Sequence, residues 1–168
     1  FYGEGAMGGV VNIVTKKQGK ADRTHAGMTY GSFNTFNSRV SRAQSVDKFS
    51  FLAGAAYLHS DGDFPYRSDN GTTLDDGDDR TLLRENNAVD DRSFLGKAAF
   101  APSERVRFSV QDDFHSAIKG VPGIITFPSP HAWQNELRNL ATARATLSDL
   151  PVFGLSFATT LAYRYNSL

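Results

Sequence analysis

The 168-residue sequence contains no cysteine. Disulfide frameworks, thiol nucleophiles and cysteine-based zinc sites are therefore excluded. The chain also has no excess of charge of either sign, because 18 lysines and arginines balance 18 aspartates and glutamates. The basic residues are scattered along the chain, and no run of them would follow a phosphate backbone, so we expect no nucleic-acid partner.

Long hydrophobic runs are missing as well. The best candidate, residues 51–58, contains Gly54 and is much shorter than the ~18 apolar residues of a transmembrane helix. The first residues have neither the basic nor the apolar region of a signal peptide, and there is no initiator methionine, so we expect the chain to begin inside a larger protein. These absences do not exclude a membrane β-sheet, whose strands need only ~10 alternating residues.

The residues that are plentiful are typical of strands and tight turns. The chain contains 13 Phe, 6 Tyr and 15 Gly, and runs of helix-forming residues are hard to find. Segments of about 10 residues alternate with turns along the chain. We predict an all-β chain with a short strand at 10–16, followed by longer strands at 24–34, 36–45, 49–60, 92–101, 105–116, 136–148 and 154–166.

The last predicted strand shows the clearest alternation of side-chain type. Because successive side chains of a strand point to opposite faces, one face is large and apolar and the other is small or polar. The apolar set is Leu155, Phe157, Thr159, Leu161, Tyr163 and Tyr165, and the polar set is Ser156, Ala158, Thr160, Ala162, Arg164 and Asn166. In 105–116, likewise, Val106, Phe108, Val110 and Phe114 oppose Arg105, Arg107, Ser109, Gln111, Asp113 and His115.

Two features favour a transmembrane barrel over a soluble β-sandwich, which also alternates. The predicted strands are longer than the usual ~5–6 residues. The connections also alternate in length, as in outer-membrane barrels. The short ones are 45–48, 102–104 and 148–153, the long ones are 61–91 and 117–135, and the link at 33–36 is an exception because it is short but falls in the long series. Aromatic residues near strand ends suit a membrane girdle and an ordinary core equally: Tyr30, Phe33, Tyr57, Phe114, Tyr163 and Tyr165.

Residues 2–16, which read YGEGAMGGVVNIVTK, carry the most information. Gly3, Gly5 and Gly8 satisfy the GxGxxG spacing of dinucleotide-binding loops. That fingerprint needs a helix after it to hold the pyrophosphate, and here a β-branched strand follows, so we reject a dinucleotide site. The Gly8–Gly9 pair instead permits a close backbone approach just before a strand.

This segment closely resembles the end of the plug domain in TonB-dependent outer-membrane receptors. The matching residues are Tyr2, Gly3, Ala6, Gly8, Gly9, Val10, Asn12 and Ile13. The resemblance implies that residues 1–17 are the C-terminal end of a plug. It also implies that residues 24–168 are the first seven or so strands of an antiparallel transmembrane β-barrel of about 22 strands. An open sheet has two bare edges, so we do not expect this part to insert into a membrane alone.

The same resemblance implies a function in the bacterial outer membrane. Receptors of this type take up a scarce, bulky nutrient such as an iron–siderophore complex, haem or cobalamin, and they break no bond in it. The implied partners are outer-membrane lipid, a small metal-chelate ligand, and the TonB–ExbB–ExbD complex, which pulls on the plug. Two other readings stay open: a soluble β-rich binding or adhesion domain, and a passive porin, although porins have no plug motif before their first strand.

The long connection 61–91 contains ten acidic and three basic residues, a net charge of −7. Its densest part holds Asp75, Asp76, Asp78 and Asp79, and clustered carboxylates on a loop are the ligands that Ca²⁺ prefers. Calcium is therefore the one candidate cofactor, although the spacing does not match an EF-hand. The alternative is a solvated surface loop.

The second long connection contains Phe127, and Trp133 lies just beyond its prolines. Both aromatic residues are candidates for ligand contact, and the alternative is that they pack the loop on its neighbours. The four histidines, His25, His59, His115 and His131, do not pair at i+2 or i+4, so we expect His115 to be a polar residue of the barrel interior near a loop. No GxSxG motif occurs, and we expect no enzyme activity.

Overall fold

The computed structural model describes residues 22–72, 74–124, 127–150 and 154–168. The predicted strand 10–16 and the predicted plug segment 1–17 lie outside these ranges. So do all eight residues of the plug motif: Tyr2, Gly3, Ala6, Gly8, Gly9, Val10, Asn12 and Ile13.

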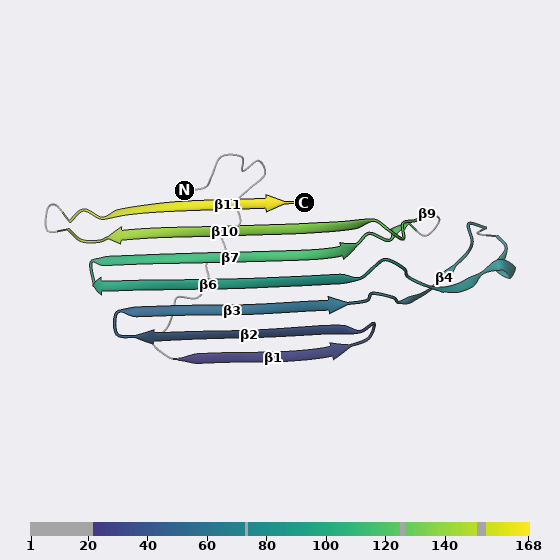
Figure 1. Ribbon diagram of the computed structural model, residues 1–168, viewed down its shortest axis with the longest axis horizontal. Helices are drawn as coiled ribbons and strands as arrows, with labels where there is room; N and C mark the ends of the chain where they lie inside the picture. The colour runs from purple at the N-terminus through teal and green to yellow at the C-terminus, as the bar shows by residue number, and fades with distance from the viewer. Residues whose placement is uncertain (1–21, 73, 125–126, 151–153) are drawn as a thin grey trace.

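Seven long strands form one antiparallel sheet whose strand order follows the chain (Figure 1). They are β1 (Arg23–Gly31), β2 (Thr35–Val46), β3 (Phe49–Ser60), β6 (Val89–Ser103), β7 (Val106–Gly120), β10 (Trp133–Leu147) and β11 (Phe157–Ser167). The prediction of an all-β chain with seven long strands is confirmed. In the described residues the sheet is open, with β1 and β11 as its two edges.

The tight connection between β1 and β2 follows from its backbone conformation. Phe33 and Asn34 both have positive φ, at 57° and 51°, and the Thr35 amide donates to the Ser32 carbonyl at 3.1 Å. Two central residues with positive φ define the mirror-image turn whose twist matches that of a hairpin. Asparagine adopts this conformation more readily than most residues. This turn explains why the first connection at the loop end is short.

Three neighbouring strands, β6, β7 and β10, extend further toward the loops than predicted. Residues 89–91, 117–120 and 133–135 belong to β6, β7 and β10, so the predicted loops 61–91 and 117–135 were too long. Backbone pairing continues there, with Val89 opposite Lys119 and Gly120 opposite Trp133. Charged and amide side chains in these extensions hide the alternation on which the sequence prediction depends.

The two long connections have structure of their own. The first contains β4 (Pro65–Ser68) and β5 (Arg80–Leu83), which pair as a hairpin, and the short 3-10 helix η1 (Asp76–Asp78). The second contains β8 (Gly123–Ile124) and β9 (Phe127–Pro128), which also pair. The sequence analysis missed both hairpins, because strands of two to four residues are too short to show a period.

The strand register fixes which residues share a face, because directly opposed residues of an antiparallel pair lie on the same side. One side, here called the apolar face, contains the following large side chains: Met28, Tyr30, Phe36, Val40, Val46, Phe49, Phe51, Tyr57, Phe94, Phe100, Phe108, Val110, Phe114, Leu137, Phe157, Leu161, Tyr163 and Tyr165. The other side, here called the polar face, contains most of the charged residues of the strands. The alternation predicted for β7 and β11 is thus confirmed within the two strands, while Arg105, Leu155 and Ser156, which were predicted to belong to them, lie outside.

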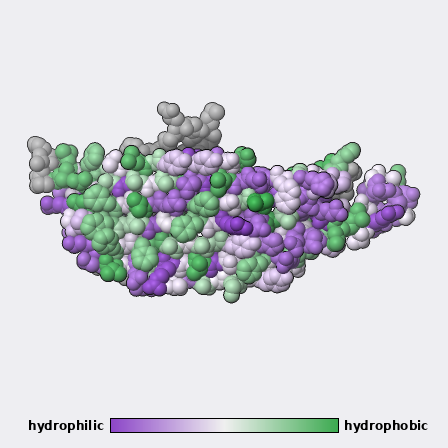
Figure 2. All heavy atoms as spheres, viewed as in Figure 1, coloured by the Kyte–Doolittle hydropathy of each residue, from purple (hydrophilic) through white to green (hydrophobic). Residues whose placement is uncertain are grey.

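The sheet has almost no buried core. In the described residues only Ala99 and Ala117 are buried, and both lie on the polar face. Leu161 on the apolar face is 73% exposed and Phe157 is 59% exposed, and no second layer of described residues covers them. Figure 2 shows hydrophobic side chains gathered near the short turns and hydrophilic side chains prevailing toward the long loops. None of the described segments is a helix of the length and hydrophobicity that a membrane span needs.

Candidate functional site

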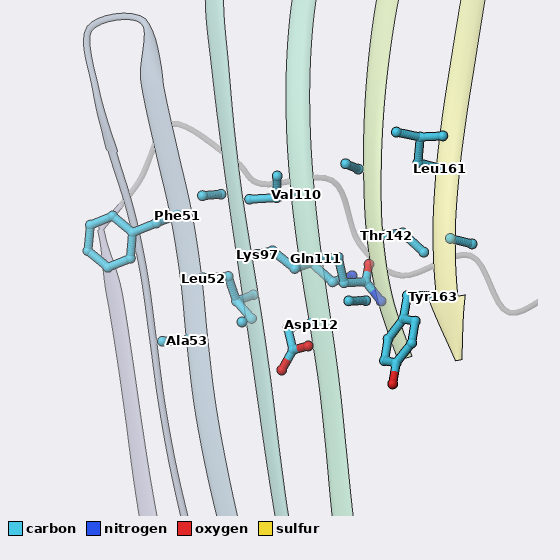
Figure 3. Close-up of a pocket in the computed structure, with 15 residues that line it drawn as sticks. Phe51, Leu52, Ala53, Lys97, Val110, Gln111, Asp112, Thr142, Leu161 and Tyr163 are labelled. Atoms are coloured by element: carbon cyan, nitrogen blue, oxygen red, sulfur yellow. The ribbon is translucent and has the colours of Figure 1, made fainter. Parts of the chain in front are cut away.

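The apolar face carries a shallow hollow of about 670 Å³ near its centre (Figure 3). Small residues form its floor, because Ala53, Gly96 and Ala141 stand in one row across β3, β6 and β10. Larger side chains surround this row: Phe51, Val110, Leu161 and Tyr163. The hollow therefore arises where a row of small side chains interrupts a surface of large ones.

One carboxylate, that of Asp112, stands in this hollow. It lies in the same row, between Gly96 on β6 and Ala141 on β10. The Nδ2 of Asn139, on the same face, donates a hydrogen bond of 3.1 Å to Asp112 Oδ1. The small neighbours leave room for the carboxylate, and the amide partly replaces water as its donor. The sequence analysis did not single out Asp112, although its even position in β7 places it among the apolar residues.

Ion pairs link neighbouring strands on the polar face at the loop end. His115 lies between two acids, with Nδ1 3.5 Å from Asp91 and Nε2 4.0 Å from Glu136, and Lys119 is 3.9 Å from Glu136. His115 lies on the polar face of β7 toward the loop end, and its place in a barrel interior stays a prediction. Such long, partly exposed pairs contribute little to stability individually, at about 0–1 kcal/mol. They define a charged surface more than a rigid site.

A second cluster, with shorter contacts, joins the two ends of the first long loop. His59 Nδ1 lies 3.0 Å from Asp90 and its Nε2 lies 3.3 Å from Asp61. Arg92 also approaches Asp90, at 3.4 Å, and its guanidinium lies 5.9 Å from the centre of the Tyr57 ring. Asp61 follows β3 and Asp90 belongs to β6, so His59 bridges the two ends of the loop.

The four aspartates predicted to bind calcium are mostly engaged with the protein itself. Asp75 Oδ1 accepts from the Gly77 amide at 3.0 Å and caps η1, and Asp79 Oδ2 accepts from Arg67 Nε at 2.7 Å. Asp78 accepts from Thr72 Oγ1 at 2.8 Å and from Asn70 at 3.1 Å, and the hydrogen bond from Thr72, followed by that from Asn70, lowers the Asp78 pKa below its ordinary value. The structure thus turns three carboxylates toward neighbouring donors.

Across the described part of the chain, no three histidine or acidic side chains converge on a point where they could hold a metal ion. The calcium site stays a prediction.

The two long loops are joined to each other by residues that follow β5. Asn86 Nδ2 lies within hydrogen-bonding distance of three carbonyls of the second loop, those of Ser129 at 2.7 Å, Ala132 at 2.8 Å and Val121 at 3.3 Å. An Arg84 guanidinium nitrogen donates to the Gly123 carbonyl. A Cβ on Gly120 would overlap the Asn86 backbone, so the close approach requires glycine there. The loops therefore form one structured cap.

The two predicted ligand-contact residues lie at this end of the sheet. Phe127 belongs to β9 and is 76% exposed, and Trp133 opens β10 and is 56% exposed. Ligand contact by either ring stays a prediction. A separate cavity of about 360 Å³ lies between the two hairpins, and its walls include Tyr66, Leu82 and Pro128. The sequence analysis missed this cavity, which depends on contacts between distant loops.

No protein-family model, curated protein or solved structure matches this chain.

Proposed function

We propose that this chain is part of an outer-membrane active-transport receptor of the TonB-dependent type, and that its apolar face meets lipid while its polar face lines an aqueous interior. The observation that carries the proposal is the pair of unlike faces without a core between them. An exposed apolar surface on this scale is not sustained in water by a lone sheet and marks contact with a membrane or another apolar partner.

The dimensions of the apolar face support lipid as that partner. On β3 and on β11 an aromatic pair brackets the strand, Phe49 with Tyr57 and Phe157 with Tyr165, and each pair is separated by eight residues. Eight residues of about 3.4 Å span about 27 Å along a strand, or about 21 Å across a membrane at a tilt of about 40°. The apolar band of outer-membrane barrels is about 25 Å tall and is flanked by aromatic girdles.

The lengths of the connections between strands support an assignment of which end of the sheet faces outside the cell. At one end β2–β3 and β6–β7 are joined by two residues each, 47–48 and 104–105. At the other end β3–β6 and β7–β10 are joined by the structured loops that form the cap. Short turns face the periplasm and long loops face outside in barrels of this type. The cap, with its exposed Phe127 and Trp133, would then meet the ligand outside the cell.

The bare edges of the sheet support a larger barrel. The outer sides of β1 and β11 present unpaired backbone groups in the described residues. Each unpaired N–H or C=O costs several kcal/mol in lipid, so a membrane sheet must close on itself. Further strands of the same protein would complete the barrel, and a plug within it would link ligand binding to TonB, as the motif in residues 2–16 implies. Uptake of an iron–siderophore complex, haem or cobalamin follows as the expected activity.

Growth rescue tests this proposal. A strain that lacks the full-length protein is supplied with one nutrient at a time: several iron–siderophore complexes, haem, or cobalamin. We expect the intact gene to restore growth on one nutrient class, and to do so only when TonB is present. If the protein fractionates with soluble proteins, or if rescue is independent of TonB, the proposal is wrong. Recovery of a soluble protein with its apolar face covered by a partner would favour the β-rich binding or adhesion domain.

A further inference from the structure

The polar face carries its charges unevenly along the strands. Its acidic residues, Asp91, Asp113 and Glu136, lie at the centre or toward the loops, and each has a basic partner within 4.0 Å. The half nearer the turns has four basic residues and no acidic residue among the described strands: Arg23, Lys97, Arg107 and Arg144. An excess of positive charge therefore collects on the polar face near the turns.

Two of these cations are neighbours on adjacent strands. Arg107 on β7 is opposite Thr146 on β10, and Arg144 on β10 is opposite Ser109 on β7. The two arginines are thus diagonal neighbours on one face, with backbones about 7–8 Å apart. Two flexible guanidinium groups at that separation can reach one small group placed between them. The hydroxyls of Ser109 and Thr146 occupy the other two corners, and Thr160 lies beside Arg144 on β11.

The surroundings leave both arginines without a counter-charge. In the described residues neither Arg107 nor Arg144 has an ion pair, and Asp149, an acid of the nearby β10–β11 turn, is 3.9 Å from Arg105 instead. Two like charges that lie close together on one face repel each other, and a bound anion relieves that repulsion. A register shift in β6 between Phe100 and Ser103 lies directly beside Arg107. Such bulges redirect side chains and often accompany functional sites.

We propose that Arg107, Ser109, Arg144 and Thr146 form a binding site for an oxyanion, a phosphate, sulfate or carboxylate group. Each guanidinium presents a planar fork of N–H donors that matches two oxygens of such a group. The two hydroxyls add donors and bring no negative charge. The bound anion neutralises the repulsion between the arginines, so binding and sheet stability increase together.

The oxyanion that binds at this site belongs to a dissolved molecule and not to a lipid. It lies on the polar face, opposite the surface that carries the exposed Phe and Leu side chains, so a lipid layer on the apolar face leaves it in water. A lipid phosphate offers the same chemistry, and the experiment separates the two sources. The site goes beyond the proposed transport function, because its geometry is a property of the sheet whether or not the apolar face meets a membrane.

Calorimetric titration of the purified full-length protein with inorganic phosphate and with sulfate tests the site. We expect saturable binding in the millimolar range that weakens as sodium chloride is added. Arg107→Gln and Arg144→Gln should each weaken binding by about tenfold or more, because each removes one charge-assisted fork. Arg23→Gln, which removes a cation of the same face and half on the distant strand β1, is the matched control and should bind as the unmodified protein does.

Folding and anion source are checked in the same preparations. Phosphate should raise the thermal midpoint of the unmodified protein, and in its absence Arg107→Gln should be at least as stable, because one repelling charge is gone. Absence of saturable binding, or equal losses in the Arg23→Gln control, would overturn the site. Binding to vesicles of an anionic phospholipid that depends on Arg107 and Arg144, without binding of free phosphate, would overturn the assignment to a dissolved molecule. None of these outcomes depends on nutrient uptake.

Discussion

Leu161 offers the sharpest energetic test of the two-faced sheet. It lies on β11 midway between Phe157 and Tyr165, and its side chain is 73% exposed. At the middle of a bilayer, an arginine on the lipid face of a barrel strand destabilises the protein by about 2–4 kcal/mol. Because 1.4 kcal/mol is a factor of about ten, Leu161→Arg should lower the ratio of folded to unfolded protein by about 30- to 700-fold.

The assay is urea unfolding of the full-length protein in phospholipid vesicles, followed by the circular dichroism of its strands. Thr160→Glu is the control, because residue 160 lies on the polar face one position away and opposite Arg144, where the introduced charge should be tolerated. In water an exposed leucine can be replaced with an effect of about 0.5 kcal/mol or less. An effect of that size for Leu161→Arg, or equal effects for both variants, would refute the assignment of the faces.

Three further outcomes follow from the described contacts. Asp112→Asn keeps an acceptor for Asn139 and removes a charge from the apolar face, so it should raise the stability in vesicles by about 1 kcal/mol, and a lower urea midpoint would contradict the account. Asn86→Ala removes a donor shared by three carbonyls, so hydrogen exchange at residues 127–132 should accelerate by about tenfold or more while exchange in the central strands is unchanged. The hydrogen bond from Thr72 lowers the pKa of Asp78 in the folded protein. The hydrogen bonds to the Asp78 carboxylate should therefore stabilise the β4–β5 loop fully above the ordinary aspartate pKa of about 3.8, and this stabilisation should be lost as the pH falls through the lower folded value. Carboxyl NMR that shows the loop opening at neutral pH would refute this prediction.

The sheet could be predicted from the sequence because its signal is local. Alternation at β7 and β11 follows from period two, and the register confirms it through pairs such as Phe94 with Phe114. The ends of the strands were less predictable, because β6 and β7 continue through charged residues that backbone hydrogen bonds hold in place. Phe114 was assigned to a strand end for the same reason, and it lies well within β7 (Val106–Gly120).

The candidate sites were harder to predict because they depend on distant partners. The aspartates of the first loop looked alike in sequence, yet Asp79 pairs with Arg67 and Asp78 with Thr72, so each has its own role. The hydrogen bonds of Asn86 join residues up to 46 positions apart, and no local pattern indicates them. The row that places Asp112 beside Gly96 likewise becomes visible only when the register of neighbouring strands is known.

The most direct test of the central claim is a cysteine scan along β11. The chain contains no cysteine, so each introduced thiol is unique within it and can carry an environment-sensitive fluorophore in vesicles that contain a lipid-borne quencher. The account predicts strong quenching for labels at Phe157, Leu161 and Tyr163, and weak quenching for labels at Ala158, Thr160 and Ala162. Quenching that does not alternate, or labels that are equally accessible to water on both faces, would contradict it.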